Sequence, residues 1–264
     1  MQPMFSEFSY GYALMEELAS GKLAPLLGAP VFPSLYREGQ SGGGYDVQLP
    51  LQGAPFFLQF KLSHYLWRSN APEWNLFGGH YYRMYLRPLR HSAQHKLLIA
   101  LNTKEEVYYV TPEFHTAWEL NEAYTSKTVV ESSVFFSPLV IGSLPDDDVH
   151  YVVFNRSNSV AYLCSEEYIK LERFYGGKVF WESQVSRTRR RKTEINERFF
   201  EAISDQIVDL LHKQISTFDQ LELLQSEMRR KRETLKEKAQ FVAYLARAYS
   251  DAELFIIAEQ DDVS

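Results

Sequence analysis

The stretch that decides the fold is an apolar segment with one lysine in it, Phe56-Phe57-Leu58-Gln59-Phe60-Lys61-Leu62. A glycine-rich segment precedes it and reads Gly42-Gly43-Gly44-Tyr45-Asp46-Val47. Side chains alternate between the two faces of a strand, so Gln59 and Lys61 share a face. Lysine is rarely buried without a partner, and the nearest upstream carboxylate is that of Asp46. The pattern therefore predicts a polar site built from these three residues.

The placement of Asp46 depends on how two strands pair. We expect strands over 44–51 and 55–62, joined by a short turn that contains glycine. A two-residue loop pairs Asp46 with Gln59 and puts Asp46 on the face that also carries Lys61. A three-residue loop would turn Asp46 to the other face. The structural alternative is an edge-strand lysine whose ammonium group reaches water beside a surface aspartate.

This arrangement resembles the PD-(D/E)XK nuclease superfamily, which has the restriction-endonuclease-like fold. The family motif is an aspartate followed, about a dozen residues later, by (D/E/Q)-x-K on the adjacent strand. Here twelve residues separate Asp46 from the triplet Gln59-Phe60-Lys61. The Q-x-K form is similar to that of Mrr-type and related antiphage nucleases. The resemblance covers about the first 110 residues and implies an α/β fold with an αβββαβ core and a mixed sheet.

A second triplet of the same kind, Gln94-His95-Lys96, lacks the rest of the pattern. Tyr81 stands where the aspartate would be, and the triplet does not lie inside an apolar strand. The full motif therefore occurs once.

The resemblance implies a site for Mg²⁺ or Mn²⁺ that hydrolyses phosphodiester bonds. Mg²⁺ takes oxygen ligands, which Asp46 and Glu7 would supply as carboxylates. The Gln59 side chain and the Phe60 backbone carbonyl would complete the protein ligands. Lys61 would orient the attacking water or stabilise the charge of the transition state.

Two points of the resemblance stay open. The family has an acid on its first helix, which Glu7 matches by position, and Glu17 is the alternative. Gln59 replaces the acid of the family motif, and an amide oxygen binds a hard cation more weakly than a carboxylate does. The second hypothesis is therefore a catalytically degenerate subunit of nuclease fold, acting as an interaction or DNA-binding component of a larger complex.

The composition sets broad limits. The chain has 264 residues, 45% of them hydrophobic, and a formal net charge of −6, which suits a globular core and argues against a histone-like DNA binder. The single cysteine, Cys164, excludes a disulfide scaffold and a thiolate zinc cluster. The sequence shows no secretory signal and no apolar run of about 20 residues, so we expect a cytoplasmic protein without a membrane partner.

Local basic clusters are the candidate nucleic-acid contacts. The densest comprises Arg187, Arg189, Arg190, Arg191 and Lys192. Arg83 is a further candidate, because it follows three aromatic side chains that could stack on bases. The alternatives are solvated helix faces for the cluster and a packed aromatic helix around Arg83.

Periodicity and turn signals predict the remaining elements. We expect further strands over 31–37, 96–101, 106–110, 149–154 and 160–164. We expect helices over 6–20, 112–124 and, as two or three helices, 190–257.

These elements suggest a nuclease-like domain over 1–186 and a helical module over 187–264. That module would serve DNA contact or assembly, as a homo-oligomer or with a protein partner. The resemblance implies that the protein is a metal-dependent DNA endonuclease, the effector of a prokaryotic restriction or antiphage defence system.

Overall fold

The computed structural model describes residues 1–19, 53–89, 94–155, 160–190, 196–214, 224–250 and 252–258. The strands expected over 31–37 and 44–51 lie outside the described residues, and so does Asp46.

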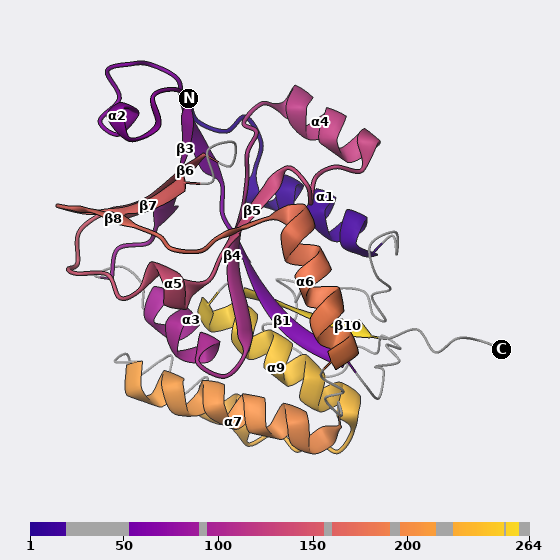
Figure 1. Ribbon diagram of the computed structural model, residues 1–264. Helices are drawn as coiled ribbons and strands as arrows, with labels where there is room; N and C mark the ends of the chain where they lie inside the picture. The colour runs from indigo at the N-terminus through magenta and orange to yellow at the C-terminus, as the bar shows by residue number, and fades with distance from the viewer. Residues whose placement is uncertain are drawn as a thin grey trace.

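Two five-stranded sheets form the frame of the molecule (Figure 1). The first has the order β10 (Ala252–Ala258), β1 (Gly53–Phe60), β4 (Glu106–Pro112), β5 (Ser133–Phe136) and β9 (Tyr175–Gly176). The second has the order β2 (Ser63–Leu66), β3 (Tyr81–Leu86), β6 (His150–Asn155), β7 (Val160–Cys164) and β8 (Tyr168–Lys170). Strands β1 and β4 are parallel, whereas the other neighbouring strands are antiparallel. The protein is thus mixed α/β with a mixed sheet, as the sequence predicts.

Helices cover both faces of the first sheet (Figure 1). On one face lie α1 (Glu7–Ala19), α4 (Ala117–Ser126) and α6 (Gly177–Arg190). On the other face lie α3 (Gln94–Asn102), α7 (Glu197–Gln214) and α9 (Leu235–Ser250), together with the second sheet. Two short helices complete the set, α2 (Trp74–Phe77) and α5 (Pro138–Ile141). None of the helices in the described ranges combines the length and the apolar character that crossing a membrane requires.

The expected first helix is confirmed. Helix α1 begins after Ser6, whose Oγ accepts a hydrogen bond from the backbone N of Ser9 over 3.1 Å, as an N-cap does. Gly11 faces the ring of Phe60, and a Cβ added there would lie 3.5 Å from that ring. The helix therefore packs closely against β1.

The expected hairpin of 44–51 with 55–62 is wrong. Strand β1 is hydrogen-bonded on both sides, to β10 and to β4, and Gln59 lies opposite Ala252 and Tyr109. A strand has two hydrogen-bonding edges, and both edges of β1 are in use around Gln59. On one side, the neighbour of β1 is therefore β10, which follows β1 by almost two hundred residues.

The helical module expected over 187–264 is only partly confirmed. Helices α7 and α9 are present, but residues 252–258 form strand β10. The apolar side chains of α7 and α9 pack in the same cluster as Phe57 and Val107 of the first sheet. Residues on both sides of the boundary expected at residue 187 thus share one core. The buried apolar side chains of α7 and α9 pack against the same chain.

Two other expected elements differ from the structure. The strand expected over 96–101 is helix α3, whereas the hairpin of 149–154 with 160–164 is confirmed as β6 and β7. The helix expected from residue 112 begins after Thr116, because Thr116 and Glu119 form a capping box. Thr111, which directly precedes the expected start of this helix, lies inside β4.

Candidate functional site

A buried polar network surrounds the end of β1. Gln59 is 3% exposed and Lys61, which directly follows the strand, is 6% exposed. Gln94, the first residue of α3, contacts both: its Nε2 donates to Gln59 Oε1 over 2.8 Å, and its Oε1 accepts from Lys61 Nζ over 3.1 Å. The shared partner shows that Gln59 and Lys61 lie on one face, as strand alternation predicts.

The network fixes the orientation of both amide groups. Gln94 Nε2 also donates to the backbone carbonyl of Ser250, at the end of α9, over 3.1 Å. A carbonyl only accepts and an ammonium group only donates, so Ser250 and Lys61 together determine which way the Gln94 amide faces. Gln59 must then turn its oxygen to Gln94, and its Nε2 donates to the Phe60 carbonyl over 2.8 Å.

This orientation does not suit a metal ion. Gln59 and the Phe60 carbonyl are two of the oxygen ligands that the sequence predicts, yet the amide nitrogen of Gln59 faces that carbonyl. Hard cations take oxygen ligands and not amide N–H groups. Within the described ranges, no group of three or more His, Cys, Asp or Glu side chains could hold a metal ion. The described residues do not fit Mg²⁺ or Mn²⁺, and the predicted carboxylate ligand Asp46 lies outside them.

The acids of the first helix lie on the other side of the sheet. Helix α1 packs against the face that carries Phe60, and Glu7 is exposed at its start. Glu17 is 4% exposed, and its Oε2 accepts hydrogen bonds from the backbone N of Val129 over 2.6 Å and of Val130 over 3.2 Å. Burial raises the pKa of Glu17, although these hydrogen bonds oppose the shift. The described structure thus does not bring Glu7 or Glu17 to the face of Gln59 and Lys61.

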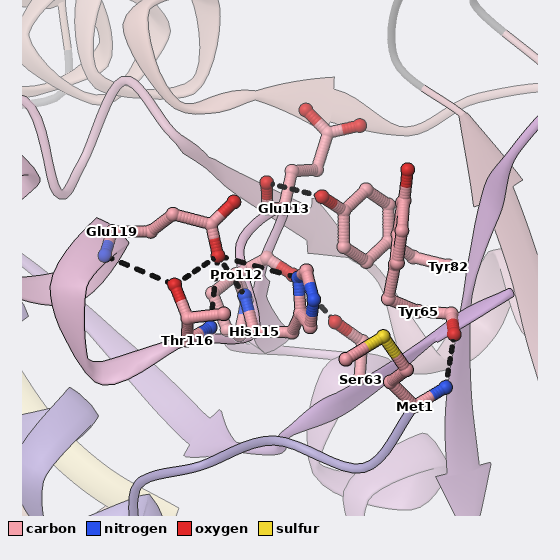
Figure 2. Close-up of polar contacts among 9 residues, drawn as sticks. All are labelled: Met1, Ser63, Tyr65, Tyr82, Pro112, Glu113, His115, Thr116 and Glu119. Carbon is pink, nitrogen blue, oxygen red and sulfur yellow. Dashed lines mark hydrogen bonds and ion pairs between the residues drawn. The ribbon is translucent and has the colours of Figure 1, made fainter. Parts of the chain in front are cut away.

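The site lies at the carboxyl ends of two parallel strands. The backbone N of Lys61 donates to the carbonyl of Val110 in β4 over 2.9 Å, which continues the ladder beyond β1. Two residues further on, Ser63 Oγ donates to the Pro112 carbonyl over 2.5 Å (Figure 2). The carboxyl ends of parallel strands are where open α/β sheets commonly bind ligands. The two chain segments that leave β1 and β4 are therefore tied together beside Lys61.

Contacts beyond these strands hold the same region in place (Figure 2). The ring of Tyr65 stacks on His115 with 4.5 Å between the ring centroids. The hydroxyl of Tyr82 donates to the Glu113 carbonyl over 2.7 Å, and Glu119 Oε2 accepts from the backbone N of His115 over 3.0 Å. The segment that follows β4 is thus anchored by side chains of the second sheet and of α4.

Two of the basic candidates are engaged in ion pairs. Arg83 lies in strand β3, not in a helix, and its guanidinium group pairs with the fully buried Glu73 and lies 4.4 Å from the centroid of the Tyr151 ring. Its side chain is 14% exposed, and its guanidinium group is engaged by Glu73. Arg187 pairs with Glu106 at the start of β4, and its side chain remains 44% exposed.

The rest of the basic cluster is largely undescribed. Arg189 and Arg190 belong to α6, but their side chains lie outside what the structure describes. Arg191 and Lys192 lie outside the described residues altogether. The cluster therefore remains a sequence-based prediction.

Sequence reasoning missed Gln94 as a member of the site. The signal was present, because Gln94 begins the second Q-x-K triplet, but the triplet was interpreted as an incomplete copy of the motif. The structure shows that this glutamine contacts the first triplet directly. Comparison with family models, with curated proteins and with solved structures finds no match for this chain.

Proposed function

We propose that this protein is a DNA endonuclease that hydrolyses phosphodiester bonds at the site around Lys61. The observation that carries the proposal is the burial of Lys61 beside Gln59 at the carboxyl ends of β1 and β4. Burying an ammonium group is costly unless it is paired, and such groups are typical of functional sites. Lysine is also a common ligand for phosphate.

The role assigned to Lys61 is electrostatic. Its ammonium group would stabilise the negative charge that develops on the phosphate during hydrolysis. Gln94 would hold that group in place by accepting one of its hydrogen bonds. The resemblance to PD-(D/E)XK nucleases extends the proposal to Mg²⁺ or Mn²⁺ as cofactor and to a role in prokaryotic restriction or antiphage defence. We derive no step through a metal ion, because the described residues do not fit one.

A cleavage assay tests the proposal. Supercoiled plasmid and a linear duplex are incubated with the full chain in Mg²⁺, in Mn²⁺ and in EDTA. The endonuclease proposal predicts nicked and then linear plasmid with either metal and no product in EDTA. Intact plasmid under all three conditions, with protein that is folded by circular dichroism, would contradict it.

A second candidate is a non-catalytic subunit of nuclease fold that binds DNA or a partner protein. The observation that favours it is the Gln59 amide, whose nitrogen faces the Phe60 carbonyl where a metal ligand would need an oxygen. Titration calorimetry with Mn²⁺ separates the two candidates. The endonuclease binds the ion as it stands, whereas the non-catalytic subunit does not.

The variant Gln59→Glu sharpens this titration. Its carboxylate can still accept the hydrogen bond from Gln94, and it adds the negative ligand that the family motif contains. Under the second candidate, Gln59→Glu gains Mn²⁺ binding that the natural chain lacks. The control is Gln225→Glu, the same chemical change at an exposed position, which should gain none.

A further inference from the structure

The hydroxyl group of Thr111 is buried, and no described residue forms a hydrogen bond with it. The residue is 0% exposed, and its Oγ1 has no partner within the described part of the chain. A buried hydroxyl without a partner costs free energy relative to the same group in water. Such a group in a folded protein requires an explanation.

The position of Thr111 suggests an explanation for its buried hydroxyl. Strands β1 and β4 are parallel with Phe60 opposite Val110, so the next residues along, Lys61 and Thr111, are neighbours. Val107 and Tyr109 belong to the cluster on the side of α3, and alternation puts Thr111 on that same face. Gln94, which holds Lys61, comes from this side of the sheet.

The backbone around Thr111 is fixed on both sides. The carbonyl before it, that of Val110, accepts from the backbone N of Lys61 over 2.9 Å. The carbonyl after it, that of Pro112, accepts from Ser63 Oγ over 2.5 Å (Figure 2). Thr111 is therefore held at a strand end beside Lys61, with its side chain on the face from which Gln94 reaches Lys61.

We propose that the Thr111 hydroxyl is a substrate contact, which donates a hydrogen bond to a phosphate oxygen of the nucleic acid that Lys61 binds. The inference rests on the proposed function and adds a second hydrogen-bond donor to its site. Phosphate oxygens only accept hydrogen bonds, so a hydroxyl and an ammonium group on neighbouring residues of adjacent strands form a matched pair of donors.

The structural alternative makes an opposite prediction. Threonine also occurs in strands because it is β-branched, and valine has the same shape without the hydroxyl. If Thr111 served the strand alone, valine would serve as well, because it buries no polar atom. The choice of threonine at this place is explained by a ligand that uses the hydroxyl.

Two variants of the full chain test the proposal, Thr111→Val and Thr111→Ser. Thr111→Val should unfold at the same temperature as the natural chain or higher, while cleavage falls on the order of 10²-fold. Thr111→Ser keeps the donor and should retain most of the cleavage even if it unfolds at a lower temperature. The control Thr125→Val alters an exposed residue of α4 and should leave cleavage unchanged.

The opposite pattern overturns the proposal. If Thr111→Val lowers the unfolding temperature while cleavage per folded molecule is unchanged, the hydroxyl is structural. If Thr111→Val cleaves normally but Lys61→Met does not, Thr111 is excluded and the proposed function survives. If the natural chain does not cleave DNA, the contact is tested by measuring binding of a duplex oligonucleotide in EDTA. Weaker binding by Thr111→Val than by Thr125→Val supports the contact. Equal binding by these variants, or no binding by the natural chain, refutes it.

Discussion

The two faces of β1 differ in what the fold buries on them. On the side of α1, the strand contributes Phe56, Leu58 and Phe60, all of which are buried in an apolar cluster. On the side of α3, Phe57 is apolar, but Gln59 and then Lys61 bring polar groups into the interior. An apolar face needs only complementary shapes, whereas a polar one needs a partner for each group. Apolar packing and buried polar groups therefore occupy opposite sides of one strand.

The buried carboxylate of Glu17 extends the comparison. It accepts hydrogen bonds from two adjacent backbone N–H groups, which ties α1 to the chain before β5. Lys61 instead contacts a side-chain amide that is itself held from α9. The first arrangement joins two segments through backbone N–H groups. The second joins three distant segments through side chains at a strand end.

The largest effect is expected from removing residues 187–264. This deletion takes away α7, α9 and β10, and so exposes one edge of β1 and the apolar cluster on the side of α3. We therefore expect the truncated chain to lose its cooperative thermal transition, measured by circular dichroism against the full chain. A truncated chain that still unfolds cooperatively would show that the C-terminal elements are separable.

The next largest effect should come from Phe60→Ala on the apolar face. Phe60 is 7% exposed, and truncating a buried phenylalanine costs about 3–5 kcal/mol of the free energy of unfolding. Cleavage per folded molecule should stay the same. Urea titration measures the loss, and Trp118→Ala, at a side chain that is 69% exposed, is the control. A loss of cleavage in folded Phe60→Ala would mean that the two faces are not independent.

Gln94→Leu should affect both stability and activity. It removes the hydrogen bonds to Gln59, Lys61 and the Ser250 carbonyl. Leaving buried polar groups without a partner costs about 1–3 kcal/mol each, and Lys61 loses the group that positions it. Urea titration and plasmid cleavage are the measurements. The control Lys96→Leu changes an exposed residue of the same helix. Gln94→Leu should have a lower free energy of unfolding and slower cleavage than this control.

The smallest effect is a change in pH dependence for Glu17→Gln. Burial raises the pKa of Glu17, so the folded protein binds this proton more tightly than the unfolded chain does. The natural chain should therefore lose stability as the pH rises from the unfolded pKa through the folded one. Glu17→Gln keeps an acceptor oxygen without ionising, so this loss should disappear from urea titrations across that window. Identical pH profiles for the two chains would contradict the assignment.

The parts of the fold that local signals specify were predicted from the sequence. Helix α1 has a serine cap and helical apolar spacing, and the β6–β7 pair is a simple hairpin. Strand β10 was missed because its partner β1 lies near the other end of the chain. Helix α3 was missed because a short apolar run does not distinguish a buried strand from a helix. Its Leu97, Leu98 and Leu101 are buried with Lys96 exposed, which is a helical pattern.

The candidate site was predicted only as far as one strand determines it. Alternation places Gln59 and Lys61 on one face, and their common contact with Gln94 confirms this. The pattern of one strand does not predict the contacts of Gln94 with this strand or with the Ser250 carbonyl, because helix packing brings these groups together. Helix α1, which carries Glu7, covers the opposite face of the sheet, and sequence position does not say which face a helix covers.

The Lys61 ammonium group is proposed to act on the phosphates of DNA. The most direct measurement compares plasmid cleavage by Lys61→Met and Lys96→Met, two variants that lose the same charge at a buried and at an exposed lysine. We predict that Lys61→Met, folded by circular dichroism, cleaves on the order of 10²–10³-fold more slowly than the natural chain, while Lys96→Met cleaves at the natural rate. Equal rates for the natural chain and a folded Lys61→Met would remove Lys61 from the chemistry and contradict the claim.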